Sequence, residues 1–387
     1  MRPDNLEANL PSRHFAPRIY GVGAWTDHLH FGYDLVALMR PRVLVELGVD
    51  RGESYFAFCQ AVSEQATGTR CFAVDTWRGD EHAGGYDETT FAEVSRHHQA
   101  HYESFSTLIR GPFDDALTRF ANEEIDILHI DGLHTEAAVR HDVESWLPKL
   151  RPGGILLLHD VSVRRRDFGV WKVWEELRLR GRSWTFADGP GLGVWQKPPA
   201  HELPSPLEAL MTAPNDLSAA LAASYRDRAA RMQATIAGHW RDGTIRHTPF
   251  AQQTVIQVFF TRDGTHCEDD SVYARIGHDG WKESTISIPA GGCQGPLRID
   301  FVSALTTIDL AVIELSRADG AVFYRADTSA ALANLRVSGD AVREPHADWL
   351  RLRITGIDPQ IYLPSVTLPE DAGHAVLKMK LRVTPAK

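Results

Sequence analysis

The stretch Val43-Leu-Val-Glu-Leu-Gly-Val-Asp-Arg-Gly-Glu-Ser54 decides the fold class of this chain. It begins as a short apolar run, which predicts a buried strand, and it ends in glycines directly before a helical pattern. Glycines at the carboxyl end of a strand let the backbone approach a ligand, and open α/β sheets bind ligands at that edge. The spacing Gly48-x-x-x-Gly52 differs from Gly-x-Gly-x-x-Gly, and Glu46 before the turn favours a cationic or amino-bearing ligand over a pyrophosphate. A tight structural turn is the alternative explanation of the glycines.

Short β-branched runs alternate with helical patterns from about residue 41 to residue 197, which is typical of a parallel sheet built from βαβ units. We therefore expect an α/β fold with a doubly wound, Rossmann-like sheet of seven strands, the last two forming a hairpin. The expected strands are Val43–Leu47, Cys71–Asp75, Ser106–Arg110, Ile125–Ile130, Gly154–His159, Ser183–Ala187 and Gly193–Gln196. Crossover helices are expected at Glu53–Gln65 and Glu136–Leu147.

Two further regions follow this sheet. Prolines interrupt the chain after residue 197, and the proline-free stretch Asp216–Trp240 predicts a helix that packs on its own chain or pairs with a second copy. Beyond residue 246, short alternating runs without helical stretches predict an all-β antiparallel sandwich. Its expected strands are Thr254–Thr261, Ser284–Ile288, Leu297–Val302, Ile308–Leu315, Trp349–Ile354 and Ala375–Val383. The predicted domains are 1–197, a helical linker 198–245, and the sandwich 246–387.

Length and charge narrow the functional classes. The 387 residues exceed one ordinary core, and 41 Lys and Arg against 51 Asp and Glu give a net charge of -10. No global basic field therefore draws the chain to nucleic acid. The first residues lack the apolar core of a signal peptide, and no run reaches the roughly 20 apolar residues of a membrane span, so we expect a soluble, cytoplasmic protein. Four cysteines without a Cys-x-x-Cys pair predict free buried thiols.

Acidic residues follow the second and third expected strands. Asp75 ends the second strand, where a carboxylate can accept hydrogen bonds from a ribose diol, and the ring of Trp77 can cover a base. Asp114 follows the third strand, where it can read an adenine amino group or cap a helix. The sequence therefore predicts a nucleoside site at this edge of the sheet.

The fourth and fifth strands end in Ile130-Asp-Gly-Leu-His134 and Leu158-His-Asp160. Asp131, His159 and Asp160 are oxygen and nitrogen ligands suited to Mg²⁺ or Mn²⁺. Adjacent strand residues point to opposite faces, so His159 and Asp160 can both bind only if the strand has begun to turn. His134 opens the next helix, where it can take a hydroxyl proton near neutral pH or make a capping hydrogen bond. Of the other histidines, only His82 carries a functional expectation.

Taken together, Val-Glu-Leu-Gly-Val-Asp-Arg-Gly-Glu-Ser, Val-Asp-Thr-Trp, Ile-Asp-Gly-Leu-His and Leu-His-Asp resemble the class I S-adenosylmethionine-dependent methyltransferases. The resemblance covers about residues 40 to 197 and is greatest to the metal-dependent branch of sugar O-methyltransferases and cephalosporin hydroxylase-like proteins. It implies that Glu46, Gly48 and Ser54 contact the methionine part of the cofactor, Asp75 the ribose, and the region of Phe113 and Asp114 the adenine. It also implies metal binding by Asp131 and Asp160 and a base at His134. His159 stands where that branch usually has a carboxylate, which favours Mn²⁺ or another transition metal over Mg²⁺.

The sequence indicates the identity of the methyl acceptor less strongly than it indicates the reaction. A glycine-rich segment that contains His82 and Tyr86 can close over substrate or be an ordinary loop, and Arg165 can recognise an anionic group or belong to a solvated charge run. We expect methylation of a sugar hydroxyl, in a bacterial polysaccharide or glycoconjugate, with the β-domain holding glycan or another subunit of a homo-oligomer. The alternatives are a small natural-product hydroxyl and a non-catalytic glycan-binding protein.

Overall fold

The computed structural model divides the chain into two compact units. The first unit comprises residues 1–79, 86–236 and 247–250, and the second, called the β unit here, comprises residues 80–85, 237–246 and 251–387. Among the described helices, none is both long and apolar enough to span a membrane. The structure describes residues 10–20, 24–80, 84–85, 88–164, 167–212, 216–241, 253–261, 266, 270–278, 280–289, 294–302, 306–364, 366–367 and 373–385.

The first unit contains one seven-stranded sheet with the strand order β5-β2-β1-β6-β7-β9-β8. The first five strands in this order run parallel, whereas β9 is antiparallel to both β7 and β8. The doubly wound sheet with a terminal hairpin is therefore confirmed. The strands are β1 (Val43–Leu47), β2 (Arg70–Asp75), β5 (Ser106–Arg110), β6 (Ile125–Ile130), β7 (Leu150–His159), β8 (Arg182–Phe186) and β9 (Leu192–Gln196).

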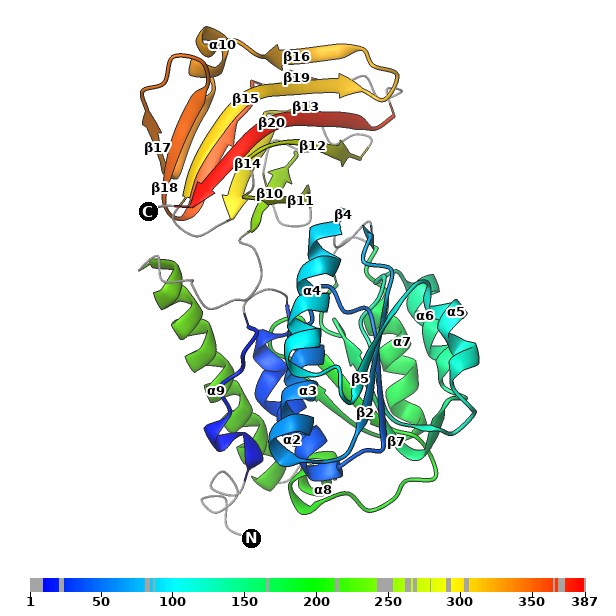
Figure 1. Ribbon diagram of the computed structural model, residues 1–387. Coiled ribbons are helices and arrows are strands. Elements are labelled where there is room, and N and C mark those ends of the chain that lie inside the picture. Colours follow the sequence, from blue (N-terminus) through cyan, green and yellow to red (C-terminus); the bar gives the residue numbers. More distant parts are fainter. Residues whose placement is uncertain are drawn as a thin grey trace. The chain divides into compact units, whose positions relative to one another are not determined.

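Helices cover both faces of this sheet (Figure 1). Leu44 belongs to the core under α2 and α3, whereas Val43 and Val45 belong to the core under α6 and α7. This alternation is the period of two expected of a strand buried on both faces. The helices are α2 (Leu29–Met39), α3 (Glu53–Gln65), α4 (Glu88–His101), α5 (Phe113–Ala116), α6 (Glu136–Trp146), α7 (Val170–Leu177) and α8 (Ser205–Met211).

The long helix α9 (Asp216–Arg241) follows the sheet, as the proline-free stretch predicted. Leu221 and Tyr225 are buried on it, and the Tyr225 hydroxyl donates a hydrogen bond of 3.0 Å to Asp34 of α2. The helix therefore packs on its own chain. The thiols Cys59 and Cys71 are free and buried, as expected, while Cys267 and Cys293 lie outside the described residues.

The β unit is antiparallel, as predicted. Its hydrogen bonds join nine strands into one sheet, in the order β11-β10-β14-β18-β15-β20-β12, with β16 beside β15 and β17 beside β18. The first and last strands in this order follow each other along the chain, so the sheet closes nearly into a barrel around one apolar core. The strands are β10 (Gln253–Phe259), β11 (Ser271–Gly277), β12 (Trp281–Ile288), β14 (Arg298–Val302), β15 (Thr306–Arg317), β16 (Val322–Ala326), β17 (Arg336–Glu344), β18 (Leu350–Tyr362) and β20 (Ala375–Pro385).

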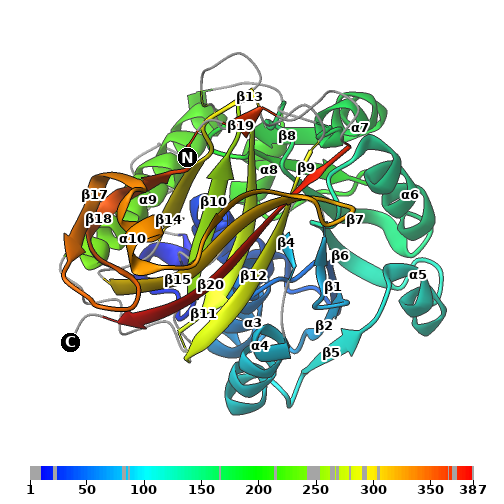
Figure 2. The ribbon, with the colours of Figure 1, turned by 90° about the horizontal axis from the view of Figure 1, so that it is seen from above.

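Two expectations for this unit are wrong in detail. A short helix, α10 (Ser329–Ala333), interrupts the strands, since the Thr328 hydroxyl accepts a hydrogen bond from the backbone N–H of Ala331 and caps it. Strand β18 also continues to Tyr362, beyond the expected end at Ile354. Seen from above, β15 and β20 run side by side over their whole length (Figure 2). Two short pairs complete the list: β3 (Gly79–Asp80) with β4 (Gly84–Gly85), and β13 (Gln294–Gly295) with β19 (Val366–Thr367).

Candidate functional site

The turn after β1 needs glycine at two positions. Gly48 and Gly52 have φ angles of +82° and +78°, in the left-handed region that other residues disfavour. A Cβ atom on Gly48 would lie 2.0 Å from the carbonyl oxygen of Asp131. The turn after β1 and the turn after β6 are therefore in direct backbone contact at the carboxyl edge of the sheet.

The Asp75 carboxylate connects the turns after β1 and β2. Its Oδ2 atom accepts hydrogen bonds from the backbone N–H groups of Val49 and Asp50, at 2.7 and 3.0 Å. Its Oδ1 atom accepts one from Trp77 at 2.7 Å, and the Trp77 indole donates to the carbonyl oxygen of Asp50. Burial raises the pKa of Asp75, while these hydrogen bonds oppose the shift. Asp75 thus fixes the loop geometry at the predicted nucleoside site.

The Glu46 carboxylate lies beneath the turn and is fully buried. Its Oε1 atom accepts a hydrogen bond of 2.6 Å from the Ser54 hydroxyl, and its Oε2 atom lies 3.3 Å from Nδ1 of His129. Burial raises the pKa of Glu46, against the opposing effects of His129 and Ser54. On the far side of its ring, His129 accepts a hydrogen bond of 3.2 Å from the Trp25 indole. In this ligand-free arrangement, Glu46 and Ser54 support the turn from below.

Two aspartates and two histidines meet at the ends of β6 and β7. The ligand atoms of Asp131, His134 and Asp160 all lie within 4.8 Å of one another. His134 Nε2 is 2.8 Å from Asp160 Oδ2 and 3.6 Å from Asp131 Oδ1. His159 Nδ1 lies near the same two oxygens, 3.5 Å from Asp160 Oδ2 and 3.2 Å from Asp131 Oδ1. We call these four residues the acid–histidine cluster.

The backbone turns at Asp160, which explains how neighbours can share the site. His159 is the last residue of β7, and Asp160 has a φ angle of +60°. This left-handed conformation turns the Asp160 side chain toward the same centre as the His159 ring, as the sequence argument required. Asp50 and Trp77 also have positive φ angles, of 46° and 49°. Such positions are found at functional sites, and these three follow strand ends at one edge of the sheet, whereas Arg40 and Ala66 have positive φ as helix C-caps.

The charges of the cluster balance internally. Burial would raise the pKa of Asp131 and Asp160, but His159 and His134 outweigh it and hold both well below the usual range. Burial would lower the pKa of His134, but its hydrogen bonds to Asp131 and Asp160 prevail and raise it to about 10. His159 shifts upward for the same reason. The two histidines and the two carboxylates therefore each favour the charged form of the other.

Several residues around the cluster were not found by sequence reasoning. Trp25 and His28 come from the segment before α2, and the ring centroids of His28 and His159 are 5.7 Å apart. The His134 ring stacks on Phe168, with centroids 4.7 Å apart and planes at 7°. For His129 a signal existed, because it is a titratable residue inside the otherwise apolar end of β6, Ile127-Leu-His-Ile130.

The remaining predicted residues do not join the cluster. Asp114 is exposed within α5 and lies 3.0 Å from His141 Nε2. It is not the helix cap, because Pro112 occupies that position. His82, Tyr86 and Arg165 lie outside the described residues.

The β unit has a buried carboxylate of its own. Asp309 is 1% exposed and accepts hydrogen bonds from two side chains on neighbouring strands, Arg351 at 2.6 Å and Arg382 at 3.1 Å. Trp281 and Trp349, two of its aromatic residues, lie beside Arg382 with ring centroids 5.2 Å apart. We call Asp309 and its two partners the aspartate–arginine cluster.

Comparison with known proteins finds similarity to a methyltransferase domain within the first unit. A family model described as a methyltransferase domain matches residues 45–161, which include β1, β6 and the end of β7. The uncharacterized protein y4gI of Sinorhizobium fredii is 46% identical over 191 residues, which is 49% of this chain. That match spans only 21% of the length of y4gI.

Solved structures with similar first units include two O-methyltransferases. One is from Bacillus cereus and was solved in complex with SAH. It is 15% identical to this chain, with a TM-score of 0.35, and the match covers 50% of this chain and 90% of that chain. The other is TomG from Streptomyces achromogenes, which is involved in tomaymycin synthesis and was solved in complex with SAM. It is 18% identical to this chain, with a TM-score of 0.34, and the match covers 51% of this chain and 90% of that chain.

Proposed function

We propose that this chain is an S-adenosylmethionine-dependent O-methyltransferase whose transfer is assisted by a divalent cation. One observation carries the proposal: Asp131, His134 and Asp160 present their ligand atoms within 4.8 Å of one another at the carboxyl edge of the sheet. The same edge holds the left-handed Gly48 turn, and the stretch from 45 to 161 matches a methyltransferase domain. Ligands of open α/β sheets bind at this edge.

The cofactor would lie over the turns after β1 and β2. The methionine part would lie over the Gly48 turn and the ribose at Asp75. Trp77, which is 1% exposed and whose ring centroid lies 4.9 Å from that of Phe91, would support the base end of the site. Asp75 is 9% exposed, and its Oδ1 atom, which accepts the backbone hydrogen bond of Trp77, has a second lone pair that can accept one from a ribose hydroxyl. We assign Glu46 and Ser54 a positioning role beneath the turn, because the Glu46 carboxylate is enclosed by Ser54 and His129. Asp114 keeps its assignment to the adenine end, since it lies at the start of α5 at the same edge.

The residues of the cluster fit a divalent cation. Two carboxylates and an imidazole are the donors that Mg²⁺ or Mn²⁺ would accept, and all three side chains are partly accessible. Asp131 and Asp160 would hold the ion, with His159 behind them. Such an ion, when bound, lowers the pKa of a coordinated hydroxyl and stabilises its alkoxide.

His134 would accept the proton of the acceptor hydroxyl. Its Nε2 atom faces the centre of the cluster and is now 2.8 Å from Asp160. Each carboxylate needs a positive partner, which in the ligand-free chain is a protonated histidine. Once the carboxylates are otherwise paired, His134 can lose its proton and Nε2 can receive one. The stacked Phe168 ring keeps the imidazole in place while this happens.

For the acceptor we propose a sugar hydroxyl in a bacterial polysaccharide or glycoconjugate. This step rests on the resemblance of the quoted motifs to the sugar-methylating branch. The β unit would then hold glycan or a second copy of the chain. The two half-buried tryptophans beside Arg382 do not favour either role, because His346 stacks on the Trp349 ring and Arg382 lies over both rings.

Calorimetric titration of the metal-stripped full chain with S-adenosylhomocysteine, repeated with Mg²⁺ and Mn²⁺, tests the proposal. We expect a Kd in the micromolar range, and separate binding of the cation. Asp75→Ala should weaken cofactor affinity at least tenfold, whereas the exposed neighbour Asp115→Ala should leave it unchanged. Absence of S-adenosylhomocysteine binding under all conditions would overturn the proposed function.

A further inference from the structure

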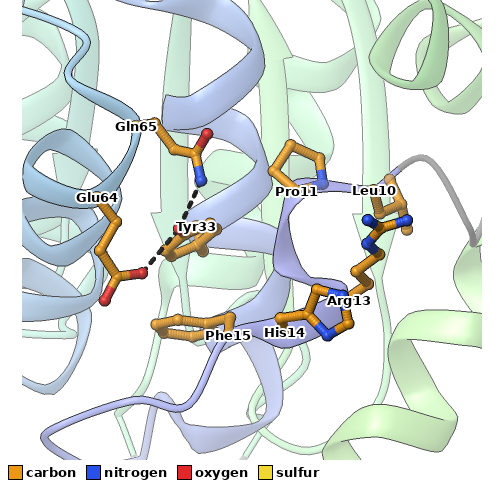
Figure 3. A pocket seen from close by; sticks show the side chains of 8 residues that line it. All are labelled: Leu10, Pro11, Arg13, His14, Phe15, Tyr33, Glu64 and Gln65. Atoms are coloured by element: carbon orange, nitrogen blue, oxygen red, sulfur yellow. Dashed lines mark hydrogen bonds between the residues drawn. The ribbon is translucent and has the colours of Figure 1, made fainter.

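Two cavities in the first unit differ in what they offer a ligand. One, of about 480 Å³, lies between the start of the described chain and the ends of α2 and α3 (Figure 3). Its polar side chains bind one another, because Gln65 donates to the Tyr33 hydroxyl and Tyr33 donates to Glu64. The other, of about 180 Å³, is lined by His28, a neighbour of the acid–histidine cluster. Only the second adjoins the proposed chemistry.

Three aromatic rings form the wall of the smaller cavity. Phe31 lies 4.8 Å from Phe186 and 5.7 Å from Tyr225, measured between ring centroids, and Phe186 and Tyr225 are 5.9 Å apart. The Tyr225 hydroxyl donates a hydrogen bond to Asp34, so the Tyr225 ring contributes an apolar face to the cavity. Ala222 and Ala229 of α9 complete the wall, and their small side chains leave the space open. Such a wall suits the apolar face of a ring.

Polar groups also line the same space. His28 is 3% exposed, and its Nε2 atom has no hydrogen-bond partner within the described part of the chain. A buried polar atom of this kind costs free energy until a ligand or water pairs with it. Arg226, which donates to Asp188 at 2.9 Å, and Asp27 also line the cavity, which places one cation and two carboxylates at the lining.

The size of the cavity limits the occupant. A volume of about 180 Å³ is below the roughly 300 Å³ at which pockets for drug-sized ligands begin, so it accommodates one ring. Aromatic faces with carboxylates and a guanidinium at the lining favour a ring that is apolar on one face and carries hydroxyl groups at its edge. A pyranose has this chemistry, whereas a phenol lacks the hydroxyl-bearing rim.

We propose that this cavity is a sugar subsite, which holds the pyranose ring adjoining the one that is methylated. The inference rests on the proposed function and specifies its acceptor. His28 lines the cavity, His159 does not, and their ring centroids are 5.7 Å apart, so a ring in the cavity would be a neighbour of the reacting centre without occupying it. Its binding would align the acceptor, and its loss would raise KM more than it lowers kcat. The subsite is built from α2, α9 and the end of β8, all outside residues 45–161.

Saturation-transfer NMR on the full chain tests the subsite without knowledge of the natural acceptor. The probes are the methyl pyranosides of glucose, mannose, galactose, rhamnose and fucose, with phenol as the competing ring. Ala229→Leu fills the cavity from α9, and Ala222→Leu does so at a less buried position in case the first variant folds poorly. Ala223→Leu, on the exposed face of the same helix, is the matched control.

We expect at least one methyl pyranoside to bind the wild type and the Ala223→Leu variant, and to bind at least tenfold more weakly to the Ala222→Leu and Ala229→Leu variants. Binding of phenol alone, or of none of the probes, would overturn the sugar assignment. Pyranoside binding that the cavity-filling variants leave unchanged would overturn the location.

The same variants titrated with S-adenosylhomocysteine separate this inference from the proposed function. Each should keep the wild-type affinity within about twofold, because the cavity lies apart from the Gly48 turn. A wild type that binds the sugar but not S-adenosylhomocysteine would retain the subsite and lose the methyltransferase assignment. The opposite result would retain the methyltransferase and lose the subsite.

Discussion

The acid–histidine cluster of the first unit and the aspartate–arginine cluster of the β unit both enclose carboxylates, but they neutralise them differently. Asp309 is paired with two guanidinium groups, which keep their charge at any ordinary pH. Asp131 and Asp160 are paired with imidazoles, which can release a proton and rotate away. A permanent pair fixes structure, whereas a pair with a titratable partner can exchange that partner for a ligand. Ligand binding in this molecule is therefore to be sought at the carboxylates whose partners can titrate, which are those of the acid–histidine cluster.

The largest expected effect comes from substitutions in the acid–histidine cluster alone. Replacing Asp131→Asn and Asp160→Asn together should weaken Mn²⁺ binding by about 1000-fold or more, because the ion loses both charged ligands. Asparagine tolerates the left-handed backbone at position 160, so the fold should persist. Electron paramagnetic resonance titration measures the free ion. Asp309→Asn is the control, and equal affinity in the double variant and the wild type would remove the metal assignment.

The second prediction breaks the aspartate–arginine cluster. Asp309→Ala leaves Arg351 and Arg382 without their carboxylate and should lower the free energy of unfolding by about 3 kcal/mol. The estimate is at the low end for a broken buried pair, because the arginine side chains remain 29% and 31% exposed. Urea unfolding gives the value. Asp319→Ala, which removes an exposed pair with Arg317, should cost less than about 0.5 kcal/mol; a similar cost for both would mean that Asp309 is not structural.

The third prediction compares how the stability contributed by each cluster depends on pH. The pKa of His134 is raised to about 10, above its unfolded value, so its contribution to stability is present below about pH 6.5 and lost as pH rises toward 10. The pKa of Asp309 is lowered, so its contribution is present above about pH 3.8 and lost in more acidic solution.

Urea unfolding of metal-free protein between about pH 6 and pH 10 should therefore separate the two clusters. The stability difference between wild type and His134→Gln should shrink by about 2 kcal/mol across this range. The difference between wild type and Asp309→Asn should stay constant. A flat difference for His134→Gln would show that its imidazole is not held protonated by the carboxylates.

The smallest expected effect concerns glycines with the same backbone conformation in the two units. Gly48 and Gly280 have φ angles of +82° and +83°, but a Cβ atom on Gly280 meets nothing within 4 Å. Alanine at position 280 should cost about 1 kcal/mol for the left-handed backbone, and alanine at position 48 should cost more, because its Cβ also meets the Asp131 carbonyl. Only Gly48→Ala should also weaken S-adenosylhomocysteine binding, by about tenfold, because it displaces the turn that carries Asp131. Calorimetry on both variants decides whether the contact matters.

The parts of the site that the sequence predicted are those set by strand ends. Asp75, Asp131 and Asp160 each follow or end an apolar run, and parallel strands bring their carboxyl ends to one edge, so their proximity could be expected. The contact of Trp25 with His129 joins residues 104 positions apart, and no local pattern encodes it.

Errors in the β unit have a similar origin. Its strand pairs are nonlocal, so the length of β18 depends on partners in β14, β15 and β17 that the local sequence does not reveal. The expected strand ended at Ile354, and Pro359, which cannot donate to a ladder, gives no local sign that the strand continues. In the structure β18 continues past it to Tyr362, and its partner β17 has a register shift between Gly339 and Ala341.

The place of Trp25 limits how this chain can be divided. The indole donates to His129, and its backbone N–H donates to Glu53, so a segment before the first strand closes the floor of the site. A fragment cut to the stretch that matches the methyltransferase model, residues 45–161, would open the imidazole of His129 and the back of His159 to water. A fragment that keeps this floor must therefore begin before residue 25, and a chimera that swaps only the matched stretch would inherit a floor shaped for another protein.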